Sequence, residues 1–156
     1  MPKIIDSTDD PMEIAINEAK ASADIGEVPV GAVIVNENGK IISRSGNLIE
    51  TFQDPTAHAE ILTIRAAAMT LGTWRLTNCD IYVTLEPCAM CASAIQHARI
   101  RRIYFGCEDY KGGAINNGVK LFNQGNCNHI PEIYDGIKSK KSKLLLKNFF
   151  ATLRKK

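Results

Sequence analysis

Four residues in two short segments can together bind a metal ion and move protons. His58 and Glu60 lie two positions apart in the first segment. Cys88 and Cys91 lie three positions apart in the second. One imidazole and two thiolates give a tetrahedral Zn²⁺ three protein ligands and leave its fourth position open for a reactive water, as in catalytic zinc sites. The carboxylate of Glu60 is then free for proton transfer. The pattern therefore predicts a catalytic zinc site.

The elements around these residues must bring the two segments together. Cys88 and Cys91 share one face if a helix runs through them, and Pro87 suits the first turn of that helix. The turn-forming run Asp54–Thr56 predicts a second helix that begins close to His58. Two helix N-termini would then face one ion, and their partial positive charge favours the thiolate forms that bind zinc.

Other interpretations of the cysteine pair remain open. By itself, Cys-x-x-Cys also occurs as a redox pair or as half of a structural zinc ribbon. A structural four-ligand site needs a second such pair or a histidine pair, and the sequence has neither. Cys127 and His129 offer two ligands, which are too few for another metal site. We expect Cys79, Cys107 and Cys127 to be single thiols, as in a reducing compartment.

The segments around the four residues resemble a known family. The following stretches are similar to the bacterial tRNA-specific adenosine deaminases of the cytidine and deoxycytidylate deaminase superfamily: Asp54–Glu60, Leu85–Cys91, Ala98–Ile100 and Phe105–Gly106. The likeness extends over about residues 12–150. It implies hydrolytic conversion of adenosine to inosine at the wobble position of a tRNA anticodon. It also implies one Zn²⁺ on His58, Cys88 and Cys91, with Glu60 as the catalytic proton carrier.

The same resemblance implies a substrate surface. Asn47 corresponds to the family's base-binding asparagine, Asp109 and Lys111 lie in its loop beside the substrate, and Phe149 matches a C-terminal aromatic near the anticodon loop. Each also has a plainer interpretation, as a turn residue, a polar loop or a helix core position. Glu108 stands where family members can carry a basic residue, so local repulsion of phosphate is a further expectation.

Positive charge is concentrated at the C-terminal end. The net charge is +2, yet residues 137–156 hold eight basic side chains and no acidic one, whereas the remaining chain carries 11 basic and 17 acidic side chains. A basic helix over about 137–156 is either a phosphate-binding surface or a solvated face. Next to a deaminase site it favours RNA, and we expect a tRNA anticodon stem-loop as partner.

Two rival functions stay open. Guanine deaminases share the Asp54–Glu60 stretch, so the alternative is a deaminase of free guanine or cytosine in nucleobase salvage, which would have no use for the basic helix. A zinc module that binds RNA without catalysis would not need Glu60. Each rival therefore leaves one feature of the chain unexplained.

The order of elements predicts a three-layer α/β/α sandwich with a mixed, roughly five-stranded sheet, in one domain over residues 1–156. Alternation of strands and helices after a hairpin favours parallel pairing with helices on both faces. The hairpin is marked by Asn38-Gly39. The expected helices cover 11–25, 57–69, 88–97 and 137–156, and the expected strands cover 31–35, 40–44, 80–85, 102–105 and 129–134.

Assembly and location follow from the resemblance and from two missing patterns. The family usually forms homodimers with the active site near the subunit interface, so we expect a homodimer. The sequence has no run of about eighteen apolar residues and no signal-peptide pattern at its N-terminus. We therefore expect a cytoplasmic protein without a membrane partner.

Overall fold

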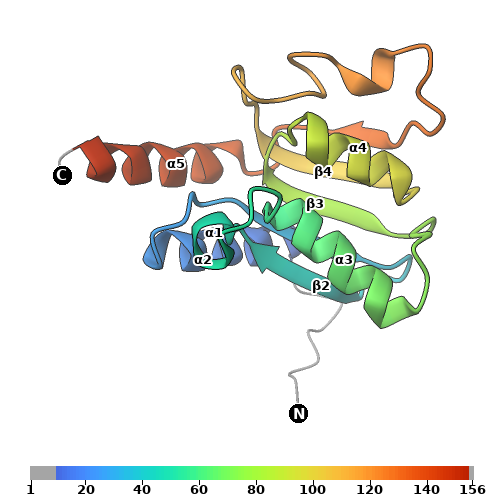
Figure 1. Cartoon of the computed structure of the whole chain (residues 1–156), viewed down its shortest axis with the longest axis horizontal. Coiled ribbons are helices and arrows are strands. Elements are labelled where there is room, and N and C mark those ends of the chain that lie inside the picture. The colour runs from blue at the N-terminus through green and yellow to red at the C-terminus, as the bar shows by residue number, and fades with distance from the viewer. Residues whose placement is uncertain (1–9, 155–156) are drawn as a thin grey trace.

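Five strands form one mixed sheet in the order β2-β1-β3-β4-β5. The computed structural model describes residues 10–154. Helices lie on both faces of the sheet, and α3 and α4 run side by side over one of them (Figure 1). The predicted three-layer α/β/α sandwich with a mixed, five-stranded sheet is confirmed.

The antiparallel part of the sheet begins with the predicted hairpin. β1 (Gly31–Val35) pairs with β2 (Ile41–Gly46). In the turn, the Asn36 side-chain oxygen accepts hydrogen bonds from the backbone N–H groups of Asn38 and Lys40, both at 3.0 Å. Gly39 has a φ of +77°, a conformation that glycine adopts without steric cost. The Asn-Gly signal therefore reflects a real backbone requirement.

The three remaining strands run parallel to one another. β3 (Asp80–Leu85) pairs antiparallel with β1, and β4 (Arg102–Cys107) and β5 (Glu132–Tyr134) follow it in parallel. The expected parallel pairing thus holds from β3 onward. Ligand sites of such sheets lie beyond the carboxyl ends of the parallel strands, so the segments after β3 and β4 are the places to look.

The sheet is buried on both faces by helices. α1 (Pro11–Asp24) and α5 (Ser139–Arg154) pack on one face, and α3 (Ala59–Leu71) and α4 (Ala89–His97) pack on the other. Alternate residues of β1 serve the two cores, with Ile34 on the α3–α4 side and Val33 on the α1 side. Because both faces are covered, all of β1 is buried, unlike a half-exposed strand.

Several element boundaries differ from the prediction. A short helix α2 (Ile49–Phe52) follows β2 and was not expected. α4 begins one residue after Cys88, which is its N-cap, so Pro87 lies just outside the helix and not in its first turn. The C-terminal helix begins at Ser139. Residues 155–156, which belong to the predicted basic helix, lie outside the described residues.

Ion pairs connect the start of α5 to the start of α1. The Lys138 ammonium contacts Asp10 at 2.8 Å and Glu13 at 2.6 Å, and Lys141 contacts Glu13 at 2.6 Å. Hydrogen bonds from these two lysines lower the pKa of Glu13 to about 2. Part of the C-terminal positive charge is therefore used within the fold. α5 then projects past the sheet (Figure 1).

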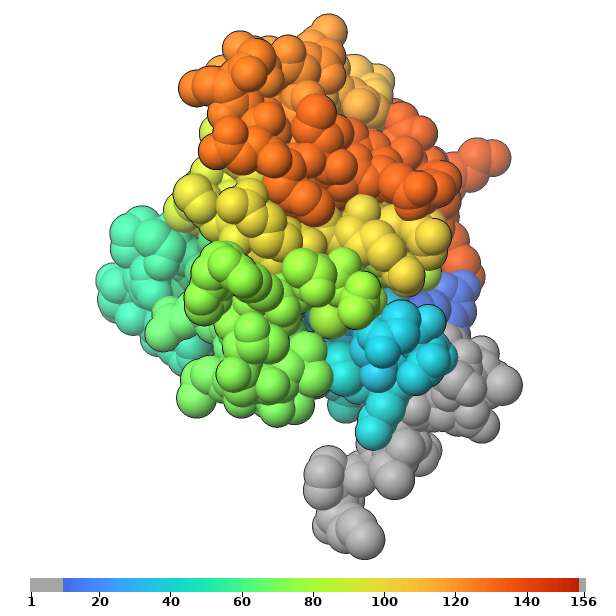
Figure 2. Space-filling view, turned by 90° about the vertical axis from the view of Figure 1, so that its right-hand side faces the viewer, coloured from blue at the N-terminus to red at the C-terminus, as the bar shows by residue number. Residues whose placement is uncertain are grey.

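The end of the molecule opposite to α5 consists of connecting segments. Figure 2 shows this end, where the turn between β1 and β2 lies near the segments that follow α3 and α4. Here Asp80 is buried at the start of β3 and accepts two hydrogen bonds of 2.9 Å from the guanidinium of Arg101. None of the helices within residues 10–154 has the length and apolar character needed to cross a membrane.

Candidate zinc-binding site and adjoining groove

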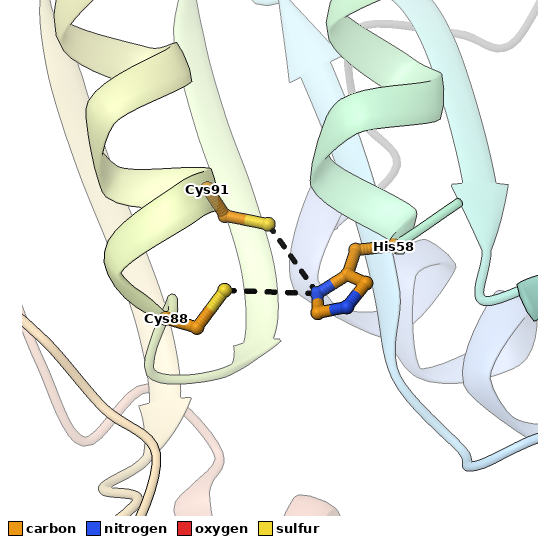
Figure 3. A group of neighbouring side chains, drawn as sticks. All are labelled: His58, Cys88 and Cys91. Atoms are coloured by element: carbon orange, nitrogen blue, oxygen red, sulfur yellow. Dashed lines mark hydrogen bonds between the residues drawn. The ribbon is translucent and has the colours of Figure 1, made fainter. Parts of the chain in front are cut away.

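The two predicted metal-binding segments meet because each starts a helix. His58 is the N-cap of α3 and Cys88 is the N-cap of α4. Both caps have extended backbone, with ψ of 151° and 176°, which directs their side chains into the space between the two helix ends. Figure 3 shows His58 pointing from α3 toward Cys88 and Cys91 at the start of α4.

The distances fit a zinc ion. The His58 Nδ1 atom lies 3.7 Å from the Cys88 sulfur and 3.5 Å from the Cys91 sulfur. All three ligand atoms lie within 4.8 Å of one another. Usual Zn–S and Zn–N bond lengths at tetrahedral angles require N–S separations of about 3.6 Å. The three side chains therefore have the chemistry and the spacing of a zinc site with one free position.

No second metal cluster accompanies this one among residues 10–154. The Cys127 thiol donates to the backbone oxygen of His129 at 3.2 Å, and His129 Nε2 lies 2.7 Å from the backbone oxygen of Ile100. Both side chains thus have structural partners. Cys79 and Cys107 are buried free thiols, as expected.

Their surroundings shift the pKa values of the two cysteines in opposite directions. The hydrogen bond from the Cys91 thiol, with a further contribution from His58, lowers the pKa of Cys88 to about 4. The neighbouring Cys88 sulfur and burial raise the pKa of Cys91. Zinc binds cysteine as thiolate, so zinc binding competes with the proton that the raised pKa of Cys91 favours.

Glu60 is buried within the first turn of α3, with 4% of its surface exposed. Burial raises the pKa of its carboxyl group, and the nearby Cys91 thiol partly offsets that effect. Since Glu60 lies two positions after His58 on the same helix end, it is next to the metal cluster without belonging to it. This placement suits a group that exchanges protons with a metal-bound ligand or a substrate.

Asn47 joins the end of β2 to the start of α3. Its side-chain oxygen accepts a 2.8 Å hydrogen bond from the backbone N–H of Ala59, and its backbone oxygen accepts one of 3.0 Å from the Ser22 hydroxyl. Among the described residues no acceptor bonds its amide nitrogen. The side chain is therefore held in one orientation and keeps an unbonded amide donor at the start of α3, where His58 and Glu60 lie.

A groove of about 1340 Å³ lies at the carboxyl ends of the parallel strands. Its lining comes from the strand ends, the loop after β4 and α5: Leu85, Gly106, Cys107, residues 108–111, Lys143, Leu146, Phe150, Leu153 and Arg154, with Val28, Asp135, Gly136 and Ser139 completing it. The groove brings together parts of the chain that sequence reasoning treated separately.

The four predicted substrate residues take different places. Asp109 and Lys111 line the groove, and Asn47 lies at the start of α3. Phe149 is half-buried on α5 and packs edge-on against Phe150, with ring centroids 5.5 Å apart. On α5, Phe150 and not Phe149 supplies an aromatic ring to the lining of the groove.

One buried carboxylate at the strand ends, that of Glu86, was not predicted from the sequence. Glu86 is 2% exposed and lies between β3 and Cys88. Its position in the sequence carries a signal, because an acidic residue that directly follows a buried strand requires hydrogen-bond donors. The sequence does not tell which donors these are.

Comparisons with known proteins agree with this geometry. Residues 6–107 match the family model of the cytidine and deoxycytidylate deaminase zinc-binding region. The tRNA-specific adenosine deaminase of Agrobacterium fabrum is 50% identical over 143 residues, which is 92% of this chain and 93% of the relative. A structure from a study of A-to-I editing by tRNA:A34 deaminases is 50% identical, with a TM-score of 0.85 and coverage of 87% of this chain and 98% of the other.

A guanine deaminase is less similar. The structure of the enzyme from Bacillus subtilis has a TM-score of 0.63 and 29% identity, and the match covers 92% of both chains. Over most of its length the chain is therefore more similar to the tRNA-specific adenosine deaminase than to the guanine deaminase, although both families share the Asp54–Glu60 stretch.

We expect the purified protein to contain a single zinc ion per chain, and Cys91→Ala to lose most of it, because removing one of three ligands weakens binding strongly. Metal analysis after dialysis against a weak chelator measures the content. Cys79→Ala is the matched control, since Cys79 is a buried free thiol outside the cluster. Equal zinc content in the two variants would contradict the assignment.

Proposed function

Because the chain belongs to the family of tRNA-specific adenosine deaminases, we propose that it converts adenosine to inosine at the wobble position of a tRNA anticodon. One observation carries this proposal. The buried Glu60 lies beside three zinc-type ligands that leave one position free, at the end of the sheet where the groove also lies. That combination provides hydrolytic chemistry at the same end of the sheet as a large surface that a substrate can contact.

The residues of the site have separate tasks in the proposed reaction. His58, Cys88 and Cys91 hold Zn²⁺, which when bound supplies the Lewis acidity that lowers the pKa of a water molecule to about 7. Glu60 accepts a proton from the attacking water and delivers it to N1 of the adenine. Oxygen adds at C6, Glu60 helps to protonate the amino group there, and ammonia leaves.

Asn47 is proposed to orient the base. Its amide nitrogen can donate to an acceptor on the purine edge, and the hydrogen bond from Ala59 N–H to its side-chain oxygen fixes which way the amide faces. Asn47 therefore positions the target base relative to the start of α3, where His58 and Glu60 lie.

The groove favours a macromolecular substrate over a free base. None of the three zinc-cluster residues lines this groove, so it offers contact surface beyond the space that the target base would occupy. The aromatic rings of Tyr110 and Phe150 can stack on unpaired bases, while Lys111, Lys143 and Arg154 can contact phosphates. A free guanine or cytosine deaminase has no use for these residues, and a non-catalytic zinc module has no use for a buried Glu60.

We also propose that residues 1–156 form one deaminase domain that acts in the cytoplasm as a homodimer. The single sheet across residues 10–154 and the family membership support this proposal. Light scattering is expected to give the mass of two chains at micromolar concentration. A single-chain mass under those conditions would argue against the dimer.

The decisive test of function is deamination of a short anticodon stem-loop with adenosine at the wobble position. We expect inosine in this RNA and no turnover of free guanine, cytosine or adenosine. Glu60→Ala should lower kcat by at least about 100-fold, because general acid–base groups contribute about 10²–10⁴-fold, and should retain zinc.

Glu37→Ala is the control for this variant, since Glu37 is exposed in the turn between β1 and β2. Turnover of a free base with unmodified RNA would move the protein to nucleobase salvage. A Glu60→Ala variant with wild-type kcat would remove the proposed role of the carboxylate.

The basic residues of α5 should not contribute equally to RNA binding. Lys143 and Arg154 line the groove, so replacing either with alanine is expected to weaken binding and to lower the slope of log K against log salt by about 1 per lost phosphate contact. Lys140 and Lys147 are exposed on α5 and do not line the groove, which makes them matched controls. Fluorescence anisotropy with labelled stem-loop RNA at several salt concentrations checks this. Equal losses for all four variants would show that only net charge matters.

A further inference from the structure

Glu86 is a buried acceptor for a whole loop. One carboxylate oxygen, Oε2, accepts hydrogen bonds from three consecutive backbone N–H groups, those of Ile115 at 3.0 Å, Asn116 at 2.9 Å and Asn117 at 3.1 Å. The other oxygen, Oε1, accepts from Asp109 N–H at 3.1 Å and from the Asn117 amide at 2.7 Å. The carboxylate therefore connects the two ends of the segment 109–117.

This arrangement depends on charge and on close approach. Consecutive backbone N–H groups that converge on one point form an anion-binding concavity, and here the anion is a side chain of the same molecule. Gly113 lies directly against the carboxylate, because a Cβ atom at that position would be 2.4 Å from the Glu86 carboxyl carbon. The loop backbone therefore packs directly against the Glu86 carboxylate, and position 113 has no room for a side chain.

The same loop forms one wall of the groove. The Asp109 carboxylate accepts from the backbone N–H groups of Lys111 at 3.2 Å and Gly112 at 2.9 Å, and Gly113 N–H donates to the Asp109 backbone oxygen at 2.9 Å. These bonds close a turn that presents Tyr110 and Lys111 to the groove. The wall is therefore internally rigid, and its attachment to the rest of the molecule depends on the groups that it contacts outside the turn.

Two backbone hydrogen bonds connect the loop and the end of β4 to the residues just before the metal-binding helix α4. The backbone N–H of Glu86 donates to the Cys107 oxygen at 2.9 Å, and the N–H of Ala114 donates to the Pro87 oxygen at 3.0 Å. Cys88, the N-cap of α4, is the next residue. A single stretch of backbone therefore links the groove wall to the zinc cluster.

We propose that Glu86 is a positioning residue that fixes the loop 109–117 relative to the start of α4. It thereby sets the distance between the groove that holds the RNA and the site that holds the target base. This inference rests on the proposed function. A misplaced loop would present Tyr110 and Lys111 to the RNA out of position relative to the target-base site, so the bonds to Glu86 are expected to matter for productive RNA binding as well as for folding.

Glu86→Gln is the variant that tests the proposal. Glutamine keeps the shape of the side chain but replaces one acceptor oxygen with an NH₂ group that faces N–H donors. We expect KM for the stem-loop RNA to rise at least about 10-fold, with a smaller change in kcat and with zinc content unchanged. Faster hydrogen exchange of the amides of residues 115–117 should accompany this rise.

Asp80→Asn is the matched control. Asp80 is likewise a buried carboxylate, but it lies at the opposite end of β3 and is bound by Arg101. Its replacement should lower the thermal stability and leave KM for the RNA at the wild-type value.

The outcomes separate the inference from the proposed function. A wild-type protein that does not act on the stem-loop fails the proposed function, whatever Glu86 does. If the wild type is active and Glu86→Gln lowers only the melting temperature, Glu86 is structural and the inference is wrong. Loss of zinc in Glu86→Gln would equally overturn it. Should that variant not fold, Asn117→Ala removes one of the five bonds and must still raise KM for the RNA.

Discussion

Two helix N-termini, those of α3 and α4, meet at one end of the sheet, and their partial positive charges act on the same small volume. His58 and Cys88 reach this volume because they are the cap residues, whose extended backbone turns the side chain away from the helix. Cys91 then follows one turn into α4. The sheet decides the separation of the two helices, so the packing of buried strands determines whether three ligand atoms lie within 4.8 Å.

Two buried glutamates near the zinc-binding residues, Glu86 and Glu60, are suited to different roles because their hydrogen-bond partners differ. Burial alone would raise the pKa of Glu86, but hydrogen bonds from Asn117 and from the loop backbone outweigh it and hold the pKa low. Burial raises the pKa of Glu60, which lacks a comparable set of donors within the described residues. A carboxylate with all its acceptor sites used is suited to hold structure, whereas one without them is suited to exchange protons. The same residue type thus serves the site in two ways.

The parts of the fold that were predictable depend on short-range chemistry. Asn38-Gly39 requires a turn, and the spacing of Cys88 and Cys91 has meaning on any helix. The parts that were missed depend on contacts between distant segments. The bonds of Glu86 reach 23 to 31 positions along the chain, and the pairing of Lys138 with Glu13 spans 125 positions. No local pattern encodes such partners, which is why the basic C-terminal segment could be recognised as charged but not divided into lysines that pair with α1 and lysines that do not.

The charged residues that line the groove are distributed unevenly. At the strand ends its charged groups are acidic except for Lys111, and the amide of Asn116 donates both to Glu108 at 3.0 Å and to Asp135 at 2.8 Å. Along α5 its charged groups are Lys143 and Arg154. We therefore expect a polyanion in the groove to be attracted toward α5 and repelled near Glu108, Asp109 and Asp135.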